Sequence, residues 1–100
     1  MGSKPIYVAP NSAQYTNFTE AMATKLLAGI TAEPTITNKK LGMSTGSFSD
    51  QGVDFTYSYQ APAQTLEINI VAVHSLKAKI AGHETIFEVL DKAVQTYLAS

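Results

Sequence analysis

The regular alternation of apolar and polar residues between positions 53 and 74 constrains the fold more than any other feature of this sequence. Apolar side chains occupy every second position before and after a loop at residues 61–64: Val53, Phe55, Tyr57 and Tyr59, then Leu66, Ile68, Ile70 and Ala72. If Gln60 pairs with Thr65 across this loop, both apolar sets lie on one face of an antiparallel β-hairpin. The opposing pairs are then Tyr59–Leu66, Tyr57–Ile68, Phe55–Ile70 and Val53–Ala72. A half-buried antiparallel sheet is therefore predicted.

A further strand is expected within residues 41–49, before the turn formed by Asp50, Gln51 and Gly52. A two-residue turn places Phe48 opposite Phe55 on the core side, whereas a three-residue loop with a bulge turns Phe48 outward. We favour the two-residue turn because burial of a phenyl side chain contributes roughly 1.5–3 kcal/mol. This strand is rich in Gly and Ser and resembles an unprotected sheet edge.

Two amphipathic helices are expected to flank the strands. The first would begin at a cap on Asn11 or Ser12 and stop near Gly29, with this apolar face: Tyr15, Phe18, Met22, Leu26 and Ile30. The second would run from Glu84 to about Leu98. Residues 6–8 are interpreted as a short extended segment. Residues 31–40 are predicted to form a connection that contains a short strand at 35–37. Residues 75–82 fit either a strand or a helix, with a break near Gly82.

These elements together predict an α+β fold in a single small domain. We expect a three- to four-stranded antiparallel meander, with the N-terminal and C-terminal helices packed on one face of it. Residues 1–5 are interpreted as a flexible lead or as a remnant of cloning.

Composition excludes several classes of function. Charged residues make up 15% of the chain and all seven basic residues are lysines, which argues against nucleic acid and phosphate-rich ligands because arginine is the preferred partner of both. The absence of cysteine excludes disulfides, thiolate catalysis and cysteine-bound zinc. No recognised spacing joins the two histidines, so we expect neither a metal nor a cofactor. No apolar run is long enough for a membrane span, no signal-peptide pattern precedes the fold, and we expect a cytoplasmic protein.

The candidate ligand-binding residues are His74, Tyr57, Tyr59 and Met22. His74 shares the parity of Leu66, which places it at the end of the sheet's inner face, where its imidazole is the only group there that titrates near neutral pH. The tyrosines of the neighbouring strand share that face. The two carboxylates that flank the turn, on Asp50 and Asp54, are interpreted as turn-forming and solvent-facing.

Val71 and Val73 are the candidate interface residues, because they are apolar at positions whose parity points away from the core. Together with the exposed edge they favour a non-enzymatic interaction or assembly module that self-associates, with a homodimer or another protein as partner. The alternative is a small-molecule binding or catalytic domain whose pocket lies between the helices and the sheet. A deep pocket reached by His74 would favour the alternative, and a filled core would favour the interaction module.

Overall fold

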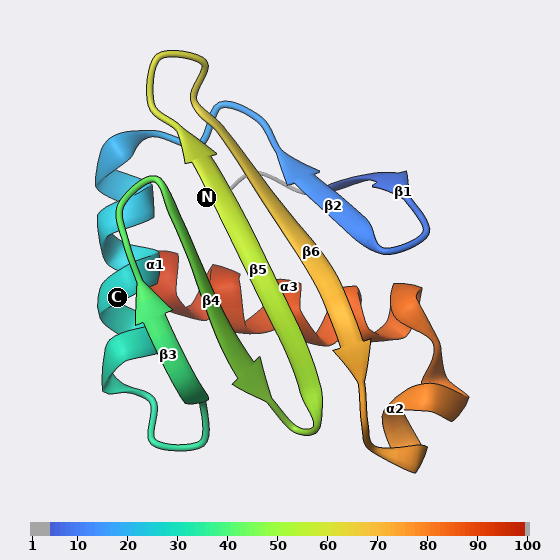
Figure 1. Cartoon of the computed structure of the whole chain (residues 1–100). Coiled ribbons are helices and arrows are strands. Elements are labelled where there is room, and N and C mark those ends of the chain that lie inside the picture. Colours follow the sequence, from blue (N-terminus) through green and yellow to red (C-terminus); the bar gives the residue numbers. More distant parts are fainter. Residues whose placement is uncertain (1–4, 100) are drawn as a thin grey trace.

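The computed structural model describes residues 5–99, which form one six-stranded antiparallel sheet and three helices (Figure 1). The α+β class is as predicted, and the expected number of three to four strands is wrong. The expected lead at residues 1–5 lies, except for Pro5, outside the described residues. In chain order the elements are β1 (Ile6–Ala9), β2 (Ser12–Tyr15), α1 (Glu20–Ala32), β3 (Thr37–Leu41), β4 (Thr45–Asp50), β5 (Val53–Gln60), β6 (Thr65–Val73), α2 (Leu76–Ala81) and α3 (His83–Leu98).

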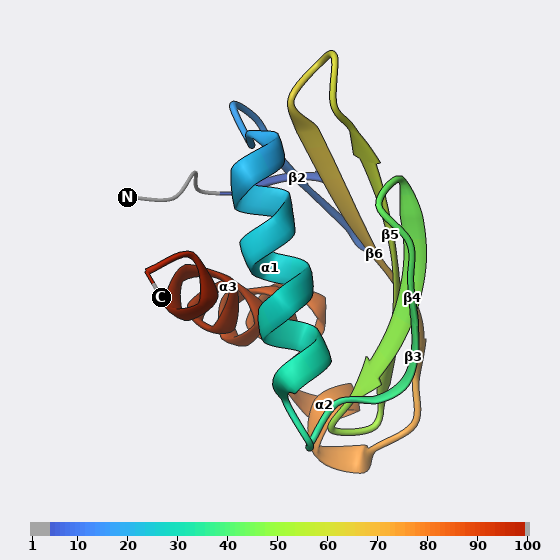
Figure 2. The ribbon, with the colours of Figure 1, turned by 90° about the vertical axis from the view of Figure 1, so that its left-hand side faces the viewer.

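The sheet forms one curved layer, and α1 and α3 cover its concave face (Figure 2). Its strand order is β1-β2-β6-β5-β4-β3, so that β1 and β3 are the edges and the central pair is β5–β6. The helix α2 lies beyond the end of β6 (Figure 1). The hydrophobic core fills part of the space between the helices and the sheet, with Phe18 and Val94 completely buried.

The central hairpin has the register that its alternation predicts over most of its length. Gln60 pairs with Thr65, and the apolar pairs Tyr59–Leu66, Tyr57–Ile68 and Phe55–Ile70 follow. The two-residue turn is also confirmed, because Asp50 pairs with Val53 and Phe48 with Phe55. The rings of Phe48 and Phe55 stack with their centroids 5.1 Å apart.

A bulge at Val71 changes the parity of the last residues of β6. Asp54 pairs with Ala72 and Phe55 with Ile70, so Val71 has no residue opposite it. Val53 consequently pairs with Val73, not with Ala72 as predicted. Beyond the bulge the inward and outward positions are exchanged.

The N-terminal segment differs from the prediction because part of it pairs with β6. Residues 12–15 form a strand along β6, with Tyr15 opposite Leu66, where a helix was expected. The helix α1 begins later, at the cap of Thr19, whose Oγ1 accepts the amide hydrogen of Met22. It continues through Gly29 to Ala32, so Gly29 does not end it.

The structure corrects the prediction for residues 37–41 and decides between strand and helix for residues 76–81. Residues 37–41 form the edge strand β3, which covers β4 and makes β4 an interior strand rather than the expected unprotected edge. Residues 76–81 form the short helix α2, capped by Ser75. Gly82 then adopts a positive φ of 87°, which a residue without a β-carbon adopts at little cost, and the chain turns there into α3. The break near Gly82 was predicted correctly.

Candidate ligand-binding cavity

A cavity of about 460 Å³ lies between α1, α3 and the concave face of the sheet. We call it the central cavity. Its wall is mainly apolar and includes Leu26, Ile36, Phe48, Phe55, Leu90 and Val94. The middle of the curved sheet stands away from the helices (Figure 2), and alanines at positions 78, 81 and 93 line the helical side. These short side chains leave the space unfilled.

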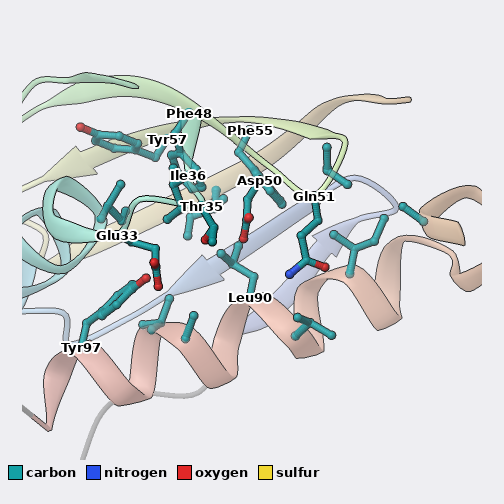
Figure 3. A pocket seen from close by; sticks show the side chains of 18 of the residues that line it. Glu33, Thr35, Ile36, Phe48, Asp50, Gln51, Phe55, Tyr57, Leu90 and Tyr97 are labelled. Atoms are coloured by element: carbon teal, nitrogen blue, oxygen red, sulfur yellow. The ribbon is translucent and has the colours of Figure 1, made fainter. Parts of the chain in front are cut away.

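One end of the central cavity is polar. Figure 3 shows Glu33, Asp50, Gln51 and Tyr97 pointing into the same space, and all four line the cavity. Glu33 caps the end of α1, while Asp50 is the last residue of β4. Tyr97 comes from the last turn of α3. Three elements that are distant in the sequence therefore bring polar groups to one place.

Asp50 lies on the inner face of the sheet because it is two residues after Phe48, which is buried. Its Oδ1 is closed off from solvent and has no hydrogen-bond partner. Burial raises the pKa of the Asp50 carboxyl, the charge of Glu33 raises it further, and a hydrogen bond from the backbone of Gln51 opposes both. Asp50 is thus an inward-facing carboxylate and not the solvent-facing turn residue that was expected.

The lysines near this end leave both carboxylates without an ion pair. Lys39 donates through Nζ to the carbonyl oxygens of Thr31 and Glu33, at 3.0 and 2.8 Å, and so binds the last carbonyls of α1. Lys77 lines the cavity from α2. The only ion pair among residues 5–99 joins His74 and Asp54. Neither Asp50 nor Glu33 is therefore neutralised by an ion pair within residues 5–99.

The carboxylates of Glu33 and Asp50 also act on Tyr97. The pKa of its hydroxyl is raised first by burial and then by Glu33 and Asp50. Its ring also fixes the distance between the two helices, because a β-carbon on Gly29 of α1 would overlap the Cγ of Tyr97. The close approach of α1 to α3 at Gly29 holds Tyr97 at the wall of the cavity.

Of the four predicted ligand-binding residues, only Tyr57 lines the central cavity. Its hydroxyl donates to the carbonyl of Gly42. Tyr59 is buried, and its hydroxyl donates to the carbonyl of Phe18 at 2.7 Å. Met22 is partly buried against the core, and its sulfur accepts the amide hydrogen of Thr19.

His74 does not reach the central cavity. The bulge turns it to the outer face, where its side chain is 65% exposed and its Nε2 lies 2.8 Å from Oδ2 of Asp54. Hydrogen bonds from Ser49 first, and then from His74, lower the pKa of the Asp54 carboxyl. The expectation that His74 lies on the inner face is wrong, and the reason is the reversed parity after Val71.

The bulge also separates the two predicted interface residues. Val71 is 63% exposed. Val73 turns inward, opposite Val53, and is partly buried against the core. The outward parity assigned to Val73 is therefore wrong, while that of Val71 is correct.

Sequence reasoning missed Asp50, Glu33, Gln51 and Tyr97 as a group. A signal existed for Asp50, since any register that buries Phe48 also turns Asp50 toward the core. No comparable signal exists for Glu33, because its position depends on where α1 ends.

Among residues 5–99 no three His, Asp or Glu side chains come together as a metal site would require, and no described helix has the length and apolar character to cross a bilayer.

Comparison with known proteins found no match to any protein-family model, to any curated protein or to any solved structure.

Proposed function

We propose that this protein binds a small, largely apolar molecule in the central cavity. The observation that carries the proposal is the cavity itself, whose volume of about 460 Å³ falls within the roughly 300–1,000 Å³ of small-molecule sites. Such sites combine apolar walls with a few polar groups that orient the ligand, as the wall and the polar end do here. Protein interiors otherwise contain few voids larger than a water molecule.

The direct test fills the cavity from the helical side. Ala93 of α3 lines the cavity, whereas Ala28 of α1 is exposed and does not. We expect the neutral fluorophore N-phenylnaphthylamine to bind the wild type with saturable enhancement of fluorescence. Ala93→Leu should weaken this binding at least about tenfold, because the added isobutyl group occupies the binding volume.

Ala28→Leu is the matched control, with the same chemical change inside a helix but outside the cavity, and it should bind the fluorophore as the wild type does. Thermal unfolding of both variants verifies that they are folded. Equal binding by the wild type and Ala93→Leu, or no saturable binding by the wild type, would contradict the proposal.

Self-association is a second candidate function, and exposed apolar residues on the sheet favour it. Val71 is exposed on the outer face, and Ile6 and Val8 are exposed on the edge strand β1. We expect a symmetric homodimer. Sedimentation velocity at high micromolar concentration should then give a dimer for the wild type and a monomer for Val71→Lys, and a monomeric wild type would remove the support for this function.

A further inference from the structure

We infer that the ligand of the central cavity is an amphiphilic amine, with a protonated nitrogen held at the polar end by Asp50 and Glu33 and an apolar body against the opposite wall. This inference rests on the proposed binding function and names the chemical class of its ligand. Four observations support it: the unpartnered carboxylate oxygen, the convergence of two acids, the absence of a paired cation and the apolar side chains that line most of the cavity.

The first observation is the state of Asp50. Its Oδ1 is inaccessible to solvent and accepts no hydrogen bond, although buried polar atoms are almost always paired. A buried acceptor without a donor is costly to the folded protein. Asp50 lines the cavity, and an ammonium group there supplies up to three donors and no acceptor, so it pairs with this carboxylate group without leaving a new group unpaired.

The second observation is the charge at this end of the cavity. Glu33 and Asp50 come from different elements, and the charge of Glu33 raises the pKa of the Asp50 carboxyl, after the larger effect of burial. A cation placed between two carboxylates removes that repulsion, whereas a carboxylate or phosphate ligand would increase it. The arrangement therefore favours a cation over an anion at this place.

The third observation is that the neighbouring lysines do not serve as this cation. Lys39 is engaged by backbone carbonyl oxygens of Thr31 and Glu33. Lys77 is exposed on α2, and no ion pair joins it to either acid. The two carboxylates are therefore available to an external cation.

The fourth observation is the shape of the remaining wall. Beside its polar residues the cavity is lined by the apolar side chains of Ile36, Phe48 and Leu90 (Figure 3) and by Ile68 and Val94. Tyr97 presents an aromatic ring beside Glu33 (Figure 3), and an aromatic face attracts a cation. An alkylammonium or arylalkylammonium ion fits both ends of the cavity.

The test compares three head groups on one tail. Decylamine, decanol and decanoate are titrated at neutral pH against the complex of the protein with N-phenylnaphthylamine, and the concentration that displaces half of the fluorophore is measured. For the wild type we expect decylamine to displace the fluorophore at a concentration at least about tenfold lower than decanol. Decanoate should be the weakest competitor.

Variants of the acids identify the residues responsible. Asp50→Asn should reduce the preference for decylamine over decanol to about threefold or less, and Glu33→Gln should reduce it partially. Asp54→Asn is the matched control, because Asp54 is on the same hairpin but faces outward, and it should keep the full preference. Thermal unfolding verifies that each variant is folded.

The outcomes separate the two proposals. If the fluorophore does not bind the wild type, the binding function itself fails. If it binds and is displaced equally by all three compounds, or if Asp50→Asn keeps the preference for the amine, the cavity binds ligands but the assignment of an amine is overturned.

Discussion

Replacing Phe55 with alanine tests whether the register of the central hairpin has been assigned correctly. Phe55 is 4% exposed, pairs with Ile70 and stacks on Phe48. Truncation of a buried phenylalanine to alanine costs about 3–5 kcal/mol, from lost transfer energy and from the new void. One side of Phe55 faces the central cavity and has fewer neighbours to lose, so we expect about 3 kcal/mol. For a chain of this size that corresponds to a fall in melting temperature of roughly 12–24 °C.

The matched control is Thr56→Ala, one position along β5 and on the opposite face of the sheet. Its cost should remain within about 1 kcal/mol, the span of strand propensity. Urea unfolding followed by far-UV circular dichroism measures both variants against the wild type. The reasoning would be refuted if Phe55→Ala unfolded within about 1 kcal/mol of the wild type, or if Thr56→Ala were equally destabilising.

Three further predictions follow from other contacts. Gly29→Ala should destabilise the protein, because overlap of the new β-carbon with Tyr97 costs about 1–3 kcal/mol and outweighs the gain of about 1 kcal/mol from helix propensity. In a Tyr97→Ala background the same substitution should stabilise the protein, as measured by urea unfolding. Asp50 has a raised pKa, so the folded state binds its proton more tightly than the unfolded state, and the stability of the protein falls as pH rises through that pKa. The melting temperature of Asp50→Asn should therefore exceed that of the wild type at neutral pH and equal it in acid. Equal melting temperatures of the two proteins at neutral pH as well as in acid would contradict this prediction. His74→Ala should change neither the melting temperature nor the affinity for the fluorophore, since the exposed pair of His74 with Asp54 is weak. A loss of fluorophore binding in this variant would show that His74 contributes to the binding site.

The sequence was sufficient to predict the central hairpin because its alternation is strict where one face is buried. Between Tyr57 and Ile70 each inward residue is apolar and each outward residue is polar, so only one register buries the apolar set. The alternation fails at Val71, Ala72 and Val73, which are all apolar. For these three residues the sequence does not indicate which side chains face the core, and no residue in this run predicts the bulge that reverses the inward and outward positions.

The N-terminal strand could not be predicted for a different reason. Tyr15 and Phe18 have helical spacing with Met22, yet residues 12–15 pair with β6, whose edge would otherwise have unpaired backbone groups. This tertiary pairing outweighs local periodicity. The predicted helix is present, but it begins at Glu20, after the cap residue Thr19.

The candidate site was predictable only in part. Tyr57 and the inward position of Asp50 follow from the hairpin register. The existence of the central cavity does not, because its volume depends on how far α1 and α3 stand from the curved sheet. The partner of Asp50 in the polar end, Glu33, is likewise placed only by the end of α1.

The central claim, that the space between the helices and the sheet holds a ligand, is tested most directly by methyl NMR during titration with N-phenylnaphthylamine. Ile36, Leu90 and Val94 line the cavity, while Val71 is exposed on the outer face of the same sheet. We predict saturable shifts of the signals of the three lining residues with a single affinity, and no shift at Val71. Shifts confined to Val71, or no saturable shift at Ile36, Leu90 and Val94, would contradict the account.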